Sequence, residues 1–313
     1  MNKLFYGLML VVSSTLVPVL SMEPTANING LAVYRLGEGK PVFLMPYPHA
    51  SGGSMADNLL ADILLGLGRS VITFDPPGAY HSTRAPAVTM GEMLNCTSET
   101  LAYFDIAGPI DFAGHSMSSF CALAFAIEHQ DRVRELVLVG SMSGWPAVRR
   151  WGLPQNWKWW RDREYWKCLV WGTRIALGLG NLAIHKRLDH LVDQASCVDR
   201  QYVSPLSVNR GDRRRPLPAR SNWFDQVRRA KLDYFPQLNQ LGLPVLICVG
   251  QYDPQTPVIM NRQLHERIPN SELVIFENSG HSPFIEEPAY FNQVLETFLI
   301  KMESGQIIRS ASD

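Results

Sequence analysis

Short runs of consecutive apolar residues recur in both terminal parts of the 313-residue chain, and they constrain its fold more than any other feature. The runs are apolar throughout rather than alternating, which is typical of strands in a parallel sheet that is covered on both faces. Segments with helical spacing separate them, and this order predicts an α/β fold with a mostly parallel, doubly wound sheet. The runs occupy residues 42–45, 71–74, 110–113, 135–139, 245–249 and 272–276.

The intervening helices are expected where apolar residues recur at helical spacing, and Gly108-Pro109 ends one of them. They cover residues 55–67, 90–106, 117–129, 258–267 and 287–301. Before the first parallel strand, Asn29-Gly30 separates two short strand-like runs at residues 25–28 and 31–35. Because Asn-Gly accommodates the positive φ angles of a two-residue turn, this segment is predicted to be a β-hairpin.

The stretch from residue 145 to 242 interrupts this alternation and contains all 8 tryptophans. It has no apolar strand-like runs, and its 18 Lys and Arg against 8 Asp and Glu give it a charge of +10 in a chain of zero net charge. We interpret residues 145–242 as a helical cap inserted into a core domain formed by residues 23–144 and 243–313. Most of the tryptophans are expected to form the core of the cap, and about two or three of them to line a pocket for a small-molecule substrate.

The first 22 residues form a separate segment, in which an uncharged and mainly apolar run follows Lys3. Val19 and Ser21 are small residues at the place where a signal peptide would be cleaved. The run also approaches the length of a membrane-spanning helix, so an uncleaved membrane tether is the alternative. Export or tethering is favoured, whereas a chain that starts at Met22 would be cytoplasmic.

Composition narrows the classes of partner and cofactor. Zero net charge gives no global reason to expect nucleic acid as a partner. The 5 cysteines include no CxxC pair and the 8 histidines no HExxH spacing, so neither a metal nor another cofactor is expected. Cys168 and Cys197 could form a disulfide if the protein is exported.

The segment Asp111-Phe-Ala-Gly-His-Ser-Met-Ser-Ser119 joins an expected strand directly to an expected helix. A serine at the centre of such a turn is held above the sheet, with the helix N-terminus beneath it. The N–H group of Met117 can then stabilise an oxyanion that develops beside the serine. Ser116 is therefore the candidate nucleophile, although a simple helix N-cap would give the same local pattern.

A serine hydroxyl needs a base, and His281 lies in the loop between the last expected strand and the last expected helix. The base in turn needs a carboxylate that fixes its tautomer and stabilises its cation. Asp253, in the loop after residues 245–249, can supply it, although an aspartate is also common at such a turn for structural reasons. All three side chains should lie at the carboxyl edge of the sheet, where open α/β folds build their sites.

The order Ser116, Asp253, His281 and the loops that carry these residues resemble the α/β-hydrolase superfamily, and among its branches the esterases, lactonases and proline iminopeptidases. The resemblance extends over residues 25–300 and is weakest in the cap. It implies an α/β-hydrolase fold with an inserted cap and a catalytic triad of these three residues. Further similar strings are Asp75-Pro-Pro-Gly78, Arg132-Val-Arg-Glu-Leu-Val-Leu-Val-Gly140 and His281-Ser-Pro-Phe-Ile-Glu-Glu-Pro288. No acid follows residues 135–139, the family's other place for the carboxylate.

Three positions depart from the pattern of the family. The nucleophile motif ends in Ser118 instead of glycine, a side chain small enough for the helix to pack close to the strand. Met45-Pro46-Tyr47 replaces the usual His-Gly-x, and Tyr47 keeps the N–H group that makes it the expected second oxyanion donor beside Met117. Tyr80 stands in place of a second glycine and is expected to narrow the mouth of the pocket.

These residues predict a serine hydrolase that cleaves a small carboxylic ester, lactone or amide through an acyl-enzyme. His49, His81 and His115 flank the site and are expected to be pocket walls. One alternative is a proline iminopeptidase-like aminopeptidase, and another is a ligand-binding protein that keeps the triad without catalysis. The ester is favoured because the basic cap, whose single glutamate is Glu164, would repel the cationic amine of a peptide substrate.

Overall fold

The computed structural model describes residues 22–48, 54–85, 88–152, 166–167, 170, 194–198 and 232–303. The expected leader, residues 1–22, lies outside this part of the chain except for Met22. Most of the expected cap, residues 145–242, also lies outside it, together with Cys168 of the candidate disulfide. The leader, the cap and the disulfide therefore stay predictions.

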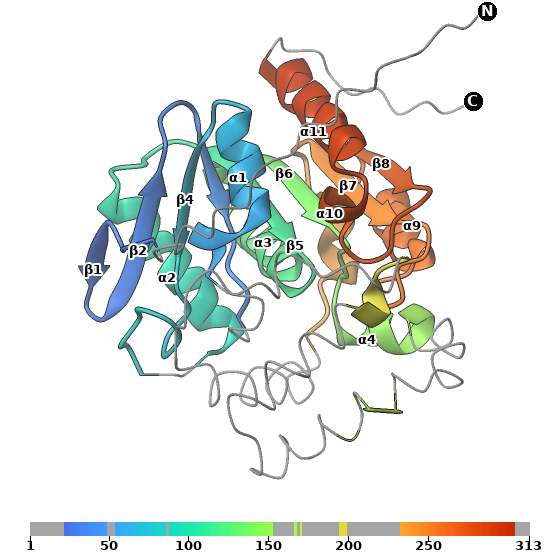
Figure 1. Cartoon of the computed structure of the whole chain (residues 1–313), viewed down its shortest axis with the longest axis horizontal. Helices are drawn as coiled ribbons and strands as arrows, with labels where there is room; N and C mark the ends of the chain where they lie inside the picture. Colours follow the sequence, from blue (N-terminus) through green and yellow to red (C-terminus); the bar gives the residue numbers. More distant parts are fainter. Residues whose placement is uncertain are drawn as a thin grey trace, which may run out of the picture.

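The core is an eight-stranded sheet with the strand order β1-β2-β4-β3-β5-β6-β7-β8 (Figure 1). Strands β1 and β2 form the predicted antiparallel hairpin, β2 pairs antiparallel with β4, and all further neighbours are parallel. The strand bounds are β1 Ala26–Ile28, β2 Leu31–Leu36, β3 Pro41–Leu44, β4 Ser70–Phe74, β5 Ile110–His115, β6 Val133–Val139, β7 Val245–Gly250 and β8 Ser271–Phe276. The mostly parallel sheet predicted from the apolar runs is thereby confirmed.

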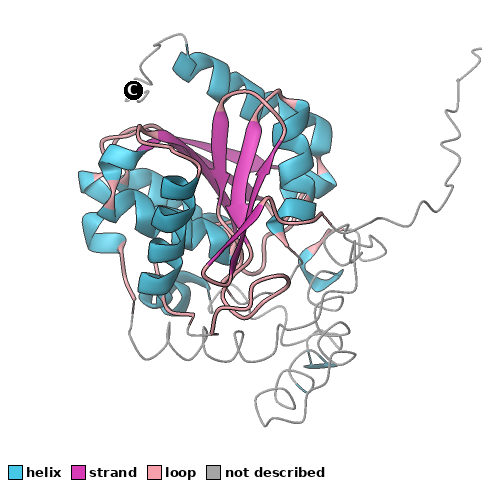
Figure 2. Ribbon diagram, turned by 90° about the vertical axis from the view of Figure 1, so that its left-hand side faces the viewer, coloured by secondary structure: helices cyan, strands magenta, loops and turns pink. Residues whose placement is uncertain are grey.

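Helices cover both faces of the sheet (Figure 2). Side chains of α2, α3 and α9 pack in one hydrophobic core, and side chains of α1, α10 and α11 pack in a second. The α-helices of the core are α1 Leu59–Gly66, α2 Met90–Tyr103, α3 Met117–Glu128, α9 Val258–Arg267, α10 Pro283–Glu286 and α11 Pro288–Glu303, and the short α4 Trp145–Ala147 follows β6. Burial on both faces explains why the parallel strands carry no polar alternation.

Two expected helices have different bounds in the structure. The helix expected at residues 55–67 is divided, because Asn58 takes an extended conformation and its side chain caps α1 by accepting a hydrogen bond from Leu60 N–H at 2.9 Å. The helix expected at residues 90–106 ends at Tyr103, because Asp105 turns into the left-handed region with a φ of 54°. The short helix α10 was not expected.

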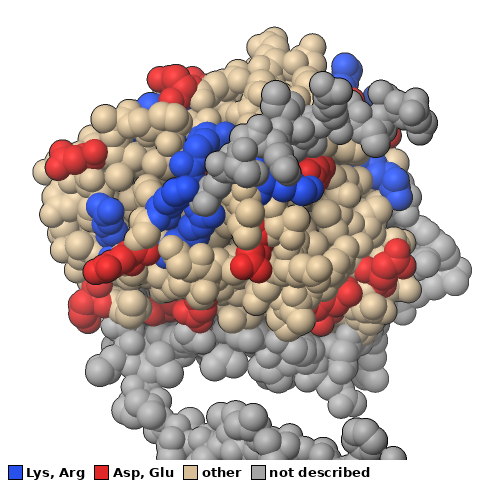
Figure 3. All heavy atoms as spheres, turned by 90° about the horizontal axis from the view of Figure 1, so that it is seen from above, with Lys and Arg blue, Asp and Glu red and all other residues tan. Residues whose placement is uncertain are grey.

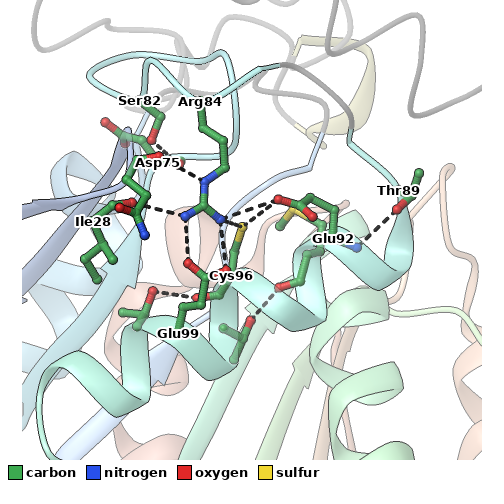
Figure 4. Close-up of polar contacts among 12 residues, drawn as sticks. Ile28, Asp75, Ser82, Arg84, Thr89, Glu92, Cys96 and Glu99 are labelled. Atoms are coloured by element: carbon green, nitrogen blue, oxygen red, sulfur yellow. Dashed lines mark hydrogen bonds and ion pairs between the residues drawn. The ribbon is translucent and has the colours of Figure 1, made fainter.

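Arg84 ties the N-terminal hairpin to α2 (Figure 4). Its guanidinium donates to both carboxylate oxygens of Glu99, at 2.6 and 3.1 Å, and lies 3.5 Å from the carboxylate of Glu92. The same group donates to the carbonyl of Ile28 at 3.1 Å. These contacts hold the loop that follows β4 against the hairpin, and they raise the pKa of Arg84 above its ordinary value, chiefly through the hydrogen bonds to Glu99.

Charges of both signs share the surface in Figure 3, where basic side chains gather near the middle of the face and acidic side chains lie around them. Ion pairs in the described part of the chain include Arg134 with the buried Asp111, at 2.6 Å, and Lys301 with Glu272, at 3.2 Å. Among the described residues, no helix is both long and apolar enough to cross a bilayer.

Candidate active site

The three candidate triad residues lie in loops at the carboxyl ends of neighbouring parallel strands. Ser116 follows the last residue of β5 directly, Asp253 lies three residues after β7, and His281 lies five residues after β8. Because these strands run parallel, their carboxyl ends share one edge of the sheet, and the structure brings the loops together there.

Ser116 occupies a sharp turn between β5 and α3. Its φ and ψ of 56° and −125° lie in a region that residues with side chains rarely adopt, as expected for a strand-to-helix elbow. Its N–H donates to the carbonyl of Val139 on β6 at 2.8 Å, which holds the turn against the sheet. The side chain is half-buried, and α3 begins at the next residue, Met117.

The serine that replaces glycine at the end of the elbow motif contributes its own contacts. Ser118 Oγ accepts a hydrogen bond from His115 N–H and donates one to the carbonyl of His115, both at 2.8 Å. The close approach of helix and strand falls instead on Gly114, where a Cβ atom would lie 2.6 Å from the backbone nitrogen of Ser119. Ser118 therefore closes the elbow with two hydrogen bonds that a glycine could not make.

Asp253 and His281 form a buried hydrogen-bonded pair. Asp253 Oδ2 lies 2.8 Å from His281 Nδ1, and each residue is only 4% exposed. The other carboxylate oxygen accepts from the N–H groups of Gln255 and Thr256 at 2.8 and 2.9 Å. Burial alone would raise the pKa of Asp253, but the imidazole of His281 and the bonds from Thr256 outweigh it and hold the pKa below its usual range.

The second ring nitrogen of His281 points away from this carboxylate. Nε2 is buried and has no hydrogen-bond partner within the described part of the chain. No hydrogen bond joins it to Ser116 among the described residues. His281 thus has one nitrogen held by a carboxylate and the other available to a hydroxyl group.

Gly140 directly follows β6, the other place for the carboxylate that the resemblance to the family implied. Its φ of 53° favours glycine, and a Cβ atom there would lie 3.1 Å from the ring of His281 and 3.2 Å from Asp253 Oδ2. Asp253 and His281 thus occupy the space that a side chain at residue 140 would need, and Asp253 is the carboxylate that lies beside the imidazole.

Tyr47 and His115 form a second buried group beside the pair. The hydroxyl of Tyr47 lies 2.5 Å from His115 Nδ1, and His115 Nε2 lies 2.8 Å from the carbonyl oxygen of His281. Burial, followed by the neighbouring His281, lowers the pKa of His115 to about 3, so the ring is neutral. His115, which was expected to be a pocket wall, is buried, and its ring packs against Phe284 with ring centroids 5.1 Å apart.

The other residues singled out around the site have separate environments. Tyr80, at the position of a family glycine, keeps the left-handed conformation with a φ of 46°. His81 lies in the same loop, with its Nδ1 3.0 Å from the hydroxyl of Tyr34. His49 lies outside the described residues. Within the described ranges, no group of three or more His, Cys, Asp or Glu side chains could hold a metal ion.

A five-residue segment, residues 194–198, packs directly on the loops of the candidate acid and base. His281 N–H donates to the carbonyl of Ser196 at 2.8 Å, and Gln255 Nε2 donates to Ser196 Oγ at 2.8 Å. Glu286 accepts from Val198 N–H through one oxygen and from Gly280 N–H through the other, both at 2.7 Å. Burial raises the pKa of Glu286 despite these bonds. No local pattern in the sequence indicates these contacts, because they join residues far apart in the chain.

Comparison with known proteins assigns the family. The family model described as "alpha/beta hydrolase fold" matches residues 46–288 of this chain. A 2-hydroxy-6-oxononadienedioate/2-hydroxy-6-oxononatrienedioate hydrolase of Dechloromonas aromatica is 25% identical over 84% of this chain and 88% of its own length. A pimeloyl-[acyl-carrier protein] methyl ester esterase of Neisseria meningitidis is 27% identical over 62% of this chain and 70% of its own length.

Among solved structures, an alpha/beta fold family hydrolase from Bacillus anthracis superposes with a TM-score of 0.70 at 21% identity, covering 86% of this chain and 95% of the other. The chain belongs to the α/β-hydrolase family, and it is an enzyme of that family.

Proposed function

We propose that this hydrolase cleaves a small carboxylic ester by acyl transfer to Ser116, with His281 as the base and Asp253 as the residue that orients it. The observation that carries the proposal is the buried Asp253–His281 pair, 2.8 Å apart, beside a serine in an elbow conformation. A hydrogen-bonded carboxylate and imidazole next to such a serine is the arrangement that activates a hydroxyl group as a nucleophile.

The reaction follows from the order of these contacts. Ser116 Oγ attacks the ester carbonyl while its proton passes to His281 Nε2. The resulting imidazolium, stabilised by Asp253, protonates the leaving alkoxide, and an acyl-enzyme remains. Water then gives a proton to His281 and attacks the acyl carbon, which releases the acid and returns the proton to Ser116.

Charge that develops on the carbonyl oxygen needs hydrogen-bond donors. Met117 is the first residue of α3, so its N–H group lies at the positive end of a helix beside Ser116. Tyr47 lies in the loop after β3, and its side chain reaches His115, the residue before Ser116. We assign the backbone N–H groups of Met117 and Tyr47 to the oxyanion hole.

Relatives support two substrate classes. The name of the Neisseria relative includes a methyl ester, which favours ester cleavage. The Dechloromonas relative acts on an oxo-dienedioate, a dianion, and the basic stretch at residues 145–242 would attract such a substrate. An oxo-dienedioate is therefore the second candidate, and the cationic amine required by an aminopeptidase fits this charge least well.

A direct comparison of substrates tests the proposal. The kcat/KM of the full chain is measured for an aryl acetate, an oxo-dienedioate and a prolyl arylamide, and we expect the aryl acetate to exceed the prolyl arylamide clearly. Ser116→Ala should lower kcat by about a thousandfold or more. Ser98→Ala, a matched change on α2, should leave kcat unchanged. Preference for the prolyl arylamide would overturn the esterase assignment, and full activity of Ser116→Ala would overturn the mechanism.

A further inference from the structure

Tyr47, His115 and His281 form one hydrogen-bonded chain that passes around the nucleophile. Tyr47 belongs to the loop after β3, His115 is the last residue of β5, and His281 lies in the loop after β8. The two hydrogen bonds, 2.5 and 2.8 Å long, both end on the ring of His115. Three separate segments of the site therefore meet at one side chain, which immediately precedes Ser116.

The partners of His115 fix its tautomer. A carbonyl oxygen can only accept a hydrogen bond, so Nε2 of His115 carries the proton and donates to the carbonyl of His281. In a neutral ring Nδ1 is then an acceptor, and the hydroxyl of Tyr47 must donate to it. The low pKa of His115, about 3, agrees with a ring that stays neutral at working pH.

We propose that His115 is a positioning residue whose neutral ring holds the Tyr47 loop and the His281 loop at fixed places on either side of Ser116. The proposal rests on the acyl-transfer function given above. It bears on a departure from the family pattern: Met45-Pro46-Tyr47 has no glycine, and two prolines flank Tyr47. The side chain of Tyr47 anchors the loop whose N–H group we assign to the oxyanion hole.

The ring of His115 also supports the base directly. Its centroid lies 4.7 Å from that of the His281 ring, and both residues are buried, so the ring of His115 packs against the base. A small displacement of a catalytic group can lower a rate strongly, because proton transfer and oxyanion binding require fixed distances. Loss of either hydrogen bond of His115 should therefore lower kcat rather than weaken substrate binding.

Tyr47→Phe is the most direct test, because it removes the hydroxyl and keeps the ring and the backbone N–H. We expect kcat for an aryl acetate to fall about tenfold to a hundredfold while KM changes less than about threefold. His115→Gln keeps a side-chain N–H for the carbonyl of His281, and it should lose activity to a similar extent. When Tyr47→Phe is added to His115→Gln, kcat should fall by less than about a further twofold, because the hydrogen bond between the two side chains is already lost.

Tyr34→Phe is the matched control. Tyr34 is also fully buried, and its hydroxyl donates to Asp75 at 2.6 Å, outside the chain of contacts around Ser116. The Tyr34→Phe variant should keep kcat within about twofold of the wild type, even if its Tm falls as far as that of Tyr47→Phe. An unchanged kcat in Tyr47→Phe, or losses that simply add in the double variant, would overturn the proposal.

Nitrogen-15 NMR of the imidazole rings separates this inference from the proposed function. At neutral pH, the signal that disappears from the wild-type spectrum in His115→Gln should belong to a neutral ring protonated at Nε2. If the signal assigned to His115 shows protonation at Nδ1, or at both nitrogens, the positioning role is contradicted even if Ser116 proves to be the nucleophile. Conversely, activity that survives in Ser116→Ala would refute the acyl-transfer function, whatever the tautomer of His115.

Discussion

At His115, burial and the neighbouring His281 lower the pKa to about 3, whereas an exposed histidine titrates near ~6.5. At pH values between these two pKa values, the unfolded chain therefore binds a proton at His115 that the folded chain does not bind. Stability that depends on the neutral ring is fully present above about pH 6.5 and is lost as the pH falls toward 3.

This difference predicts the acid sensitivity of the fold. Between pH 7 and pH 5, protonation of His115 in the unfolded state should lower the free energy of unfolding by about 2 kcal/mol. Urea unfolding at the two pH values measures the loss in the wild type and in His115→Gln, which lacks the titrating ring. We expect the loss in the variant to be smaller by about that amount, and equal losses would contradict the assigned neutral ring.

Gly140 leaves no room for a side chain, because its φ is positive and a Cβ atom there would lie against the ring of His281. Gly140→Ala should lower kcat at least about tenfold, since the new methyl group would displace the imidazole, and it should cost about 1–2 kcal/mol of stability. Gly108→Ala, whose Cβ atom would meet nothing within 4 Å, is the matched control. Equal activity of the two variants would show that the His281 pair tolerates displacement.

At the scale of the elements, Arg84 connects the β1–β2 hairpin to α2 through its bonds to Ile28 and Glu99. A lysine at this position cannot bind both carboxylate oxygens and a carbonyl in the same geometry. Arg84→Lys should therefore lower the free energy of unfolding by about 1–3 kcal/mol in urea titrations. Arg35→Lys, an exposed change on β2, should have little effect, and equal stability of both variants would contradict the role of Arg84.

The strands of the core were predictable because burial on both faces leaves an uninterrupted apolar run, as in β7, where every residue from Val245 to Gly250 is buried. Helix ends were less predictable, because the left-handed turn at Asp105 depends on one backbone angle. The placement of Ser116, Asp253 and His281 followed from the position of each residue relative to a strand. The contacts of Tyr47 with His115 and of Ser196 with His281 join segments far apart in the chain, so no local pattern indicated them.

At the scale of the whole molecule, segments from almost the entire core domain meet at one edge of the sheet. The loops after β3, β5, β7 and β8 supply Tyr47, Ser116, Asp253 and His281, and residues 194–198 pack on two of these loops. The parallel sheet determines where each loop begins, and buried hydrogen bonds hold the side chains of the loops in position. The activity proposed here is thus a property of the assembled fold rather than of the elbow motif alone.

Covalent labelling of the native enzyme tests the central claim, that Ser116 is an activated nucleophile. A fluorophosphonate should modify the folded protein once, and fragmentation of the modified peptide should place the adduct on Ser116 rather than on the neighbouring Ser118 or Ser119. Ser116→Ala and heat-denatured wild type should remain unlabelled, and Asp253→Asn should react much more slowly. No adduct on the folded wild type, or an adduct on another residue with Ser116 unmodified, would contradict the account.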